Sequence, residues 1–242
     1  MHNTSSYKIG PLPGITFGAE LIPKVSAQAL VTDLEHDPKP VLDAFYEAHG
    51  LMLFKDLNDI NDDPFLLVRL SRLFGPEVEN YRKTVTPERL IHSQASEVIV
   101  ISNLPPMNFP VPDQPDPPTT PDGQIPMQFP HRKGWHTDQS FRRPPPDISL
   151  FYAMQPTPKG QGQTLYADGT AAYSSLSQEM QQTVAELSAI HAIPWTGRGE
   201  DAVRAGEIPT PLEPHQASQA QPIVRIHPVT GQPALYLCEE GQ

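Results

Sequence analysis

Residues 134–141 read Gly134-Trp135-His136-Thr137-Asp138-Gln139-Ser140-Phe141 and carry the strongest indication of the fold. In an extended segment, the side chains of residues i and i+2 point to the same face. The pattern therefore predicts that His136 and Asp138 present an imidazole nitrogen and a carboxylate oxygen to one point in space. These groups are two-thirds of a 2-His-1-carboxylate facial triad, which binds iron(II) and leaves coordination positions open. A His-x-Asp pattern alone is common, and a solvated surface pair is the alternative interpretation.

The segment before this stretch is unusually rich in proline. Ten of the 30 prolines fall between Leu104 and Pro130. A segment of this composition forms neither a helix nor a central strand. It is either a disordered surface insertion or a semi-rigid flap over a site. The flap is the favoured interpretation, because the segment runs directly into the histidine-rich stretch at 131–138.

Composition argues against several classes of protein. With 28 acidic and 17 basic side chains, the formal charge is -11, which disfavours binding to nucleic acid. No run approaches the roughly 20 apolar residues of a membrane helix, and the first residues lack a secretory pattern. The single cysteine, Cys238, argues against a disulfide framework. We therefore expect a cytoplasmic protein that binds neither membrane nor nucleic acid.

Hydrophobic periodicity and capping signals predict helices and strands. Helices are expected at 38–49, at 63–75 with Asp63 as N-cap, and after the N-cap Ser177. The buried stripe of the third helix is expected to be Met180, Val184, Leu187 and Ile190. Strands separated by long loops, with few helices between them, suggest a mainly β jelly-roll core with flanking helices. The expected strands are 51–54, 98–102, 148–154, 164–167, 223–226 and 234–238, with turns at 159–163 and 228–231.

Further motifs follow one another along the chain. They are Gly18-Ala19-Glu20, His49-Gly50-Leu51 through Phe54, Phe74-Gly75, Trp135-His136-Thr137-Asp138 with Phe141, Gly162-Gln163-Thr164 through Asp168, Ala171-Ala172-Tyr173 with Leu176, and His227-Pro228-Val229-Thr230-Gly231 with Leu235-Tyr236. In this order they resemble the taurine dioxygenase-like (TauD/TfdA) family of iron(II)- and 2-oxoglutarate-dependent oxygenases. The resemblance covers nearly the whole chain, although Gln161 replaces the first glycine of the family's Gly-Gly-x-Thr element.

The resemblance implies a fold and a set of ligands. Residues 1–242 are expected to form a single jelly-roll (double-stranded β-helix) oxygenase domain that is incomplete at its C-terminus, with a loop at 104–130. His136 and Asp138 would bind Fe(II), and Thr164 would donate a hydrogen bond to the 2-oxoglutarate carboxylate. On propensity alone, Thr164 is a plain strand residue. In relatives, the third ligand, a histidine, and an arginine that pairs with 2-oxoglutarate lie beyond the counterpart of Gln242.

The resemblance also implies a reaction. O2 and 2-oxoglutarate are consumed, succinate and CO2 are released, and a small organic substrate is oxidised, most simply by hydroxylation. Family members commonly take substrates with sulfonate or carboxylate groups, and they often form homo-oligomers. The candidate substrate-pocket residues are Asn80, Tyr81, Trp135, Phe141 and Arg142.

Basic side chains gather around the predicted ligands of this acidic chain. They are His131, Arg132, Lys133, Arg142 and Arg143. They are either solvated loop charges or a local positive field that attracts anionic 2-oxoglutarate and an anionic substrate.

Two other functions stay open from the residues alone. One is a non-enzymatic jelly-roll binding protein with a degenerate metal site, and the other is a zinc hydrolase, although no His-Glu-x-x-His motif supports it. Within the chain, the candidate third ligands are His191, His215 and His227. His227 is the best placed of the three, but we expect it to be structural.

Overall fold

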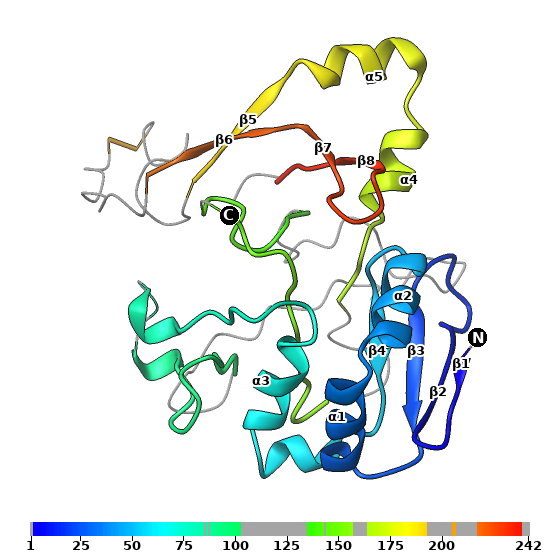
Figure 1. The fold of residues 1–242 in the computed structure, drawn as a ribbon. Helices are drawn as coiled ribbons and strands as arrows, with labels where there is room; N and C mark the ends of the chain where they lie inside the picture. The colour runs from blue at the N-terminus through cyan, green and yellow to red at the C-terminus, as the bar shows by residue number, and fades with distance from the viewer. Residues whose placement is uncertain are drawn as a thin grey trace, which may run out of the picture. The chain divides into compact units, whose positions relative to one another are not determined.

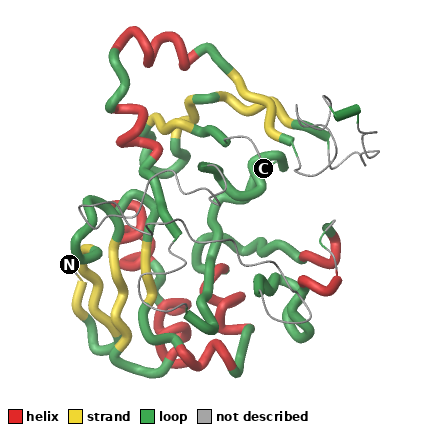
Figure 2. The backbone as a smooth tube through the Cα atoms, turned by 180° about the vertical axis from the view of Figure 1, so that it is seen from behind, coloured by secondary structure: helices red, strands yellow, loops and turns green. Residues whose placement is uncertain are grey.

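The computed structural model describes residues 2–84, 86, 88–102, 135–142, 144–156, 164–192, 205–206 and 217–238. The chain divides into two compact units. Unit 1 comprises Met1–Ile101, Ile148–Ala172 and His227–Gln232, and unit 2 comprises Ser102–Asp147, Tyr173–Ile226 and Pro233–Gln242. The described residues form a mixture of helices and small sheets (Figure 2). The proline-rich loop at 104–130 and the turn at 159–163 lie outside them.

Unit 1 is built on a four-stranded sheet with the order β1-β2-β3-β4 (Figure 1). The strands β1 (His2–Asn3), β2 (Tyr7–Pro11) and β3 (Ala19–Pro23) are antiparallel neighbours. The fourth strand, β4 (Met52–Phe54), pairs in parallel with β3 and confirms the strand expected at 51–54.

Two helices connect β3 to β4, because strands that pair in parallel need a crossover connection. Helix α1 (Ala27–His36) begins after Ser26, whose Oγ accepts a hydrogen bond from the Ala29 N–H at 3.3 Å. Helix α2 (Lys39–Glu47) confirms the helix expected at 38–49. Helix α1 was not predicted, although its apolar residues recur at helical spacing.

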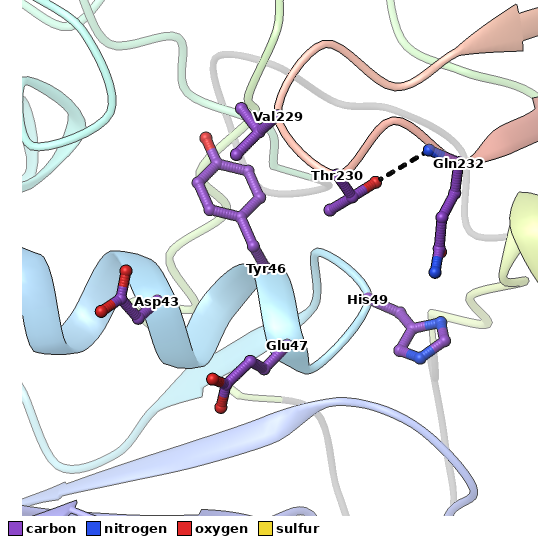
Figure 3. A pocket seen from close by; sticks show the side chains of 7 residues that line it. All are labelled: Asp43, Tyr46, Glu47, His49, Val229, Thr230 and Gln232. Atoms are coloured by element: carbon purple, nitrogen blue, oxygen red, sulfur yellow. Dashed lines mark hydrogen bonds between the residues drawn. The ribbon is translucent and has the colours of Figure 1, made fainter.

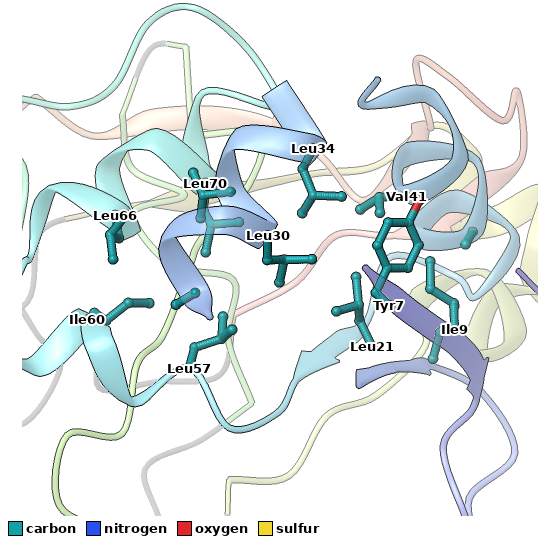
Figure 4. Packing of buried hydrophobic residues seen from close by; sticks show 14 residues of the cluster. Tyr7, Ile9, Leu21, Leu30, Leu34, Val41, Leu57, Ile60, Leu66 and Leu70 are labelled. Atoms are coloured by element: carbon teal, nitrogen blue, oxygen red, sulfur yellow. The ribbon is translucent and has the colours of Figure 1, made fainter. Parts of the chain in front are cut away.

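The core of unit 1 lies between this sheet and its helices (Figure 4). Leu21 of β3, Leu30 and Leu34 of α1 and Val41 of α2 have no exposed surface. Burial of one such side chain contributes about 1.5–3 kcal/mol to stability. These contacts fix the position of α2, which is followed by Ala48 as its C-cap and then by His49 and Gly50 in a turn.

The helix expected at 63–75 is shorter than predicted. Helix α3 (Phe65–Ser71) has Pro64 as its N-cap residue, and Asp63 Oδ1 accepts a hydrogen bond from the Phe65 N–H at 3.0 Å. Beyond α3 the backbone tightens, since the N–H groups of residues 73–75 bond to the carbonyls three residues earlier. Three short 3-10 turns complete this part of unit 1: η1 (Asn58–Asn61), η2 (Tyr81–Lys83) and η3 (Glu88–Leu90).

Unit 2 contains two antiparallel ribbons. In the first, β5 (Ser188–His191) pairs with β6 (Gln219–Pro222). In the second, β7 (Val224–Ile226) pairs with β8 (Pro233–Leu235), which confirms the two strands expected near the end of the chain. The predicted turn at 228–231 joins β7 to β8, with Gly231 at a φ of 71°.

The helix expected after Ser177 forms but ends early. Ser177 Oγ accepts a hydrogen bond from the Met180 N–H at 3.2 Å, and α5 spans Gln178–Ala185. The predicted buried stripe is wrong, because α5 has no buried residue. Met180 and Leu187 are each 47% exposed, Val184 is only half-buried, and Ile190 belongs to β5 and is 70% exposed. Pairing with β6 satisfies the backbone of residues 188–191 and competes with extension of the helix. The short helix α4 (Gly169–Ser174) precedes α5.

Three predicted strands are wrong. Residues 148–154 and 164–167 have no strand structure, and 98–102 contribute only an isolated bridge from Ile99 to Ile91. Phe151 and Tyr166 are largely exposed. A strand requires a partner for its backbone groups, and within the described residues none forms a ladder with these segments.

The helices are also short. Among the residues that the structure describes, none of the helices has the length and apolar character needed to cross a membrane.

Candidate functional site

His136 and Asp138 lie side by side in unit 2, as their spacing predicts. His136 Nε2 is 3.1 Å from Asp138 Oδ1, and the two side chains are 31% and 60% exposed. Two cis ligands of an ion with bonds of about 2.1 Å lie about 3 Å apart. The imidazole and the carboxylate therefore have the chemistry and the separation to bind one metal ion, and both are open to solvent.

The chain turns immediately after this pair. Gln139 adopts a φ of 52°, in the left-handed region of backbone conformation that residues other than glycine rarely adopt. The Arg142 N–H donates to the Gln139 carbonyl at 3.0 Å, and Arg142 Nη1 donates to Gln139 Oε1 at 2.8 Å. The backbone and side-chain bonds hold the turn together.

Ser140 ties this turn to the β5–β6 ribbon. Its Oγ lies 2.8 Å from His191 Nδ1, and its carbonyl accepts a hydrogen bond from Gln221 Nε2 at 3.0 Å. Cys238 Sγ lies 3.1 Å from the same Oγ. Ser140, His191 and Gln221 are all buried. The sequence did not predict this network, because its members are 51 to 98 positions apart from Ser140.

Burial sets the protonation of His191. Removal from water lowers the pKa of this imidazole below its ordinary value, because the charged form loses its hydration. A neutral His191 can accept a hydrogen bond at Nδ1 from the Ser140 hydroxyl. The ring of Tyr236 stacks on His191 with centroids 5.5 Å apart, and the Arg225 guanidinium lies 4.5 Å from the Tyr236 centroid. Burial raises the pKa of Tyr236.

The other predicted site residues divide between the two units. In unit 2, Trp135 and Phe141 flank the His136–Asp138 pair in sequence and are half-buried. Asn80, Tyr81 and Thr164 belong to unit 1.

The three unit 1 residues have local roles. Asn80 caps η2 by accepting a hydrogen bond from the Arg82 N–H at 3.1 Å, and the Tyr81 N–H donates to the Ser96 carbonyl at 2.8 Å. Thr164 is exposed and lies in a loop rather than in the expected strand.

Of the basic cluster, the structure describes Arg142 alone; the other four members, His131, Arg132, Lys133 and Arg143, lie outside the described residues.

The candidate third ligands have different surroundings. His191 is buried against Ser140, and His215 lies outside the described residues. His227 Nδ1 accepts hydrogen bonds from the N–H groups of Val229 and Thr230, at 3.2 and 3.1 Å, and so holds the turn that follows β7. Within the described residues, no group of three His, Cys, Asp or Glu side chains could hold a metal ion.

A hollow of about 380 Å³ lies in unit 1, between the end of α2 and the turn at 227–232 (Figure 3). Asp43, Tyr46, Glu47 and His49 line one side of it, and Thr230 is among the residues on the other. None of the predicted site residues lines this hollow.

His49 also belongs to a polar cluster that the sequence did not predict. Its Nδ1 lies 2.6 Å from Asp168 Oδ2, and the Asp168 side chain is 8% exposed. Burial raises the pKa of Asp168, but hydrogen bonds from Thr170, Ala171 and His49 outweigh burial and hold this pKa below its ordinary value. His49 and Asp168 both occur in the motifs that resemble the family, and these motifs were the only indication in the sequence that the two residues matter.

Comparison with known proteins gives a match along most of the chain. The family model described as "Taurine catabolism dioxygenase TauD, TfdA family" matches residues 8–241.

Individual relatives match over shorter segments. The chain is 34% identical over 104 residues to an alpha-ketoglutarate-dependent sulfonate dioxygenase of Saccharomyces cerevisiae, which covers 43% of this chain and 24% of that protein. It is 28% identical over 155 residues to pentalenolactone F synthase of Streptomyces arenae, a match that covers 60% of this chain and 46% of that protein. An alpha-ketoglutarate-dependent sulfate ester dioxygenase of Pseudomonas putida is 28% identical over 110 residues, a match that covers 43% of this chain and 35% of that protein. The chain thus spans from about a quarter to just under half of the length of these relatives.

Proposed function

We propose, because this chain belongs to the taurine catabolism dioxygenase TauD, TfdA family, that it acts as an iron(II)- and 2-oxoglutarate-dependent dioxygenase on a small organic substrate. The observation that carries the proposal is the 3.1 Å separation of His136 Nε2 and Asp138 Oδ1 within the chain that the family model matches. Relatives named as alpha-ketoglutarate-dependent dioxygenases support the same chemistry. Bound iron(II) with 2-oxoglutarate and O2 would supply the oxidation, with release of succinate and CO2.

The protein residues have distinct proposed roles. His136 and Asp138 are the iron ligands, and Thr164 donates a hydrogen bond to the 2-oxoglutarate carboxylate. The third ligand of the triad is proposed to be a histidine outside these 242 residues. Trp135 and Phe141, both half-buried next to the ligands in sequence, restrict water at the metal.

Anaerobic metal binding tests the proposal. Addition of iron(II) and 2-oxoglutarate to the full-length natural protein should produce the weak visible charge-transfer band of the chelate. The variants His136→Ala and Asp138→Ala should lose the band, because each removes a ligand of the proposed triad. Replacement of the exposed His36 by Ala is the matched control and should leave the band unchanged. A wild-type protein without the band, or a His136→Ala variant that keeps it, would contradict the proposal.

We further propose that the substrate carries an anionic group. Two relatives are named for sulfonates and sulfate esters, and a third is named an (S)-phenoxypropionate/alpha-ketoglutarate-dioxygenase. Asn80 and Tyr81 are proposed to contribute to the pocket. Arg142, four residues after Asp138, is half-buried, and its guanidinium brings positive charge close in sequence to the ligands of a chain with net charge -11.

Steady-state kinetics with a panel of sulfonates, sulfate esters and carboxylates tests this assignment. Arg142→Gln, alone or with Arg143→Gln, should raise KM for an anionic substrate, roughly tenfold for the loss of about 1.4 kcal/mol of attraction. Arg89→Gln removes an exposed charge elsewhere and should leave KM unchanged. An unchanged KM in the Arg142 variant would remove Arg142 from the pocket.

The jelly-roll fold, a single domain over residues 1–242, a cytoplasmic location and homo-oligomer formation are further proposals. The family match along residues 8–241 supports the first two. A crystal structure of the full-length protein and its mass in solution would test the fold and the oligomeric state.

A further inference from the structure

The β5–β6 ribbon has one exposed face and one buried face. Along β5, Ser188 and Ile190 are exposed, while His191 is buried, and in β6 Gln221 is buried. Successive strand residues alternate between faces, and cross-strand partners share a face. His191 pairs with Gln219, two residues before Gln221, so His191 and Gln221 point from the same face of the ribbon.

Both of these side chains bind one residue. His191 Nδ1 is 2.8 Å from Ser140 Oγ, and Gln221 Nε2 donates to the Ser140 carbonyl at 3.0 Å. The ribbon therefore holds the side chain and the backbone of Ser140 at the same time. Two directed contacts restrict both translation and rotation of a residue, which one contact does not.

Cys238 extends the attachment to the other side of Asp138. Its Sγ lies 3.1 Å from Ser140 Oγ and 3.8 Å from the Thr137 carbonyl. Thr137 and Ser140 bracket Asp138 in sequence, and Asp138 itself is exposed. The exposed Asp138 carboxylate thus lies on a short segment in which Thr137 and Ser140, on either side of it, are bound by distant residues of the same unit.

We propose that Ser140 is a positioning residue, held by His191 and Gln221, that fixes the His136–Asp138 turn for iron binding. This inference rests on the proposed function, since it assigns Ser140 a role through the two proposed ligands. Residues that orient metal ligands without touching the metal typically contribute about 10- to 100-fold to metal affinity. The turn also contains Gln139 in the left-handed region, so it would relax toward other conformations if Ser140 were released.

Iron(II) affinity and stability together test the role of Ser140. Anaerobic titration of the full-length protein, with 2-oxoglutarate present, should give Ser140→Ala an iron(II) dissociation constant about tenfold above that of wild type. Ser140→Thr keeps the hydroxyl and should restore the wild-type constant. Ser188→Ala removes a hydroxyl from the exposed face of the same ribbon and should bind iron(II) as wild type does.

A double variant separates positioning from stability. Ser140→Ala leaves buried His191 Nδ1 without its partner, which lowers stability by itself. In Ser140→Ala/His191→Leu both polar partners are gone, so the melting temperature of the metal-free protein should recover toward wild type while the iron(II) affinity stays weak. Recovery of both would overturn the positioning role, as would a Ser140→Ala variant that binds iron(II) as tightly as wild type. If wild type itself forms no chelate band, the proposed function fails instead.

Discussion

Among single residues, His191 shows how burial determines a protonation state. Its side chain is 4% exposed, and its Nε2 has no hydrogen-bond partner among the described residues. Burial lowers the pKa of this imidazole below the ordinary value of 6.5. The folded protein therefore keeps His191 neutral at pH values where the unfolded chain has already taken up a proton.

The stability of the protein should consequently fall in mild acid. Below pH 6.5 the unfolded state binds more protons at this position, so the free energy of unfolding decreases as the pH decreases toward the folded pKa. Between about pH 6.5 and about pH 5.5, the loss through His191 is at most about 1 kcal/mol. Urea unfolding at both pH values measures it.

The His191→Leu variant should lose this part of the pH dependence, because leucine does not titrate. His36→Gln, at an exposed position, should keep it. An equal pH dependence in wild type and His191→Leu would show that His191 is not the group responsible.

At the scale of elements, α1 is the centre of unit 1. Its residues Leu30, Val31 and Leu34 have no exposed surface, and they recur at i, i+1 and i+4 on one face of the helix. This face packs into the cluster that contains residues of the sheet, α2 and α3 (Figure 4). Helix α1 is part of the crossover connection between the parallel strands β3 and β4. Its packing therefore also helps to hold these two strands in register.

Truncation of Leu34 should therefore strongly destabilise the folded protein. Leu34→Ala removes a fully buried side chain and leaves a cavity, and we expect the free energy of unfolding to fall by about 2–5 kcal/mol. Leu53→Ala in β4 is the matched control, since Leu53 is 45% exposed, and it should cost less than about 1 kcal/mol. Denaturant unfolding of the two variants compares them, and equal losses would contradict the assigned core.

At the scale of the whole chain, these 242 residues carry a net charge of -11, which would oppose the approach of the proposed anionic co-substrate, 2-oxoglutarate. Binding of 2-oxoglutarate would then depend on a metal ion that supplies positive charge at His136 and Asp138. Ligands that bind only the folded state stabilise it by mass action.

The melting temperature should accordingly respond to both ligands together. At concentrations near 100 times the dissociation constant, iron(II) with 2-oxoglutarate should stabilise the full-length protein by about 2.7 kcal/mol, and anaerobic thermal melting should shift upward by several degrees. The His136→Ala variant should show no shift, and 2-oxoglutarate without metal should shift wild type little. A full shift with 2-oxoglutarate alone would indicate a binding site that does not depend on the metal.

Local signals in the sequence were sufficient wherever neighbouring residues decide the structure. The 3.1 Å approach of His136 Nε2 to Asp138 Oδ1 depends on two residues that are only two positions apart in the chain. The Ser177 cap of α5 and the turn that ends at Gly231 likewise depend on short-range hydrogen bonds and backbone preferences. These features, together with the ordered motifs, determined the family and the centre of the candidate site.

Tertiary structure alone decided what depends on distant partners. Residues 148–154 have the composition of a strand, but a strand forms only where another segment satisfies its backbone. The turn after Asp138 is held by His191 and Gln221, 51 and 81 residues from Ser140, because the pairing of β5 with β6 places both side chains on one face. The sequence by itself therefore determined the two proposed ligands at residues 136 and 138, and only the fold determined what holds them in place.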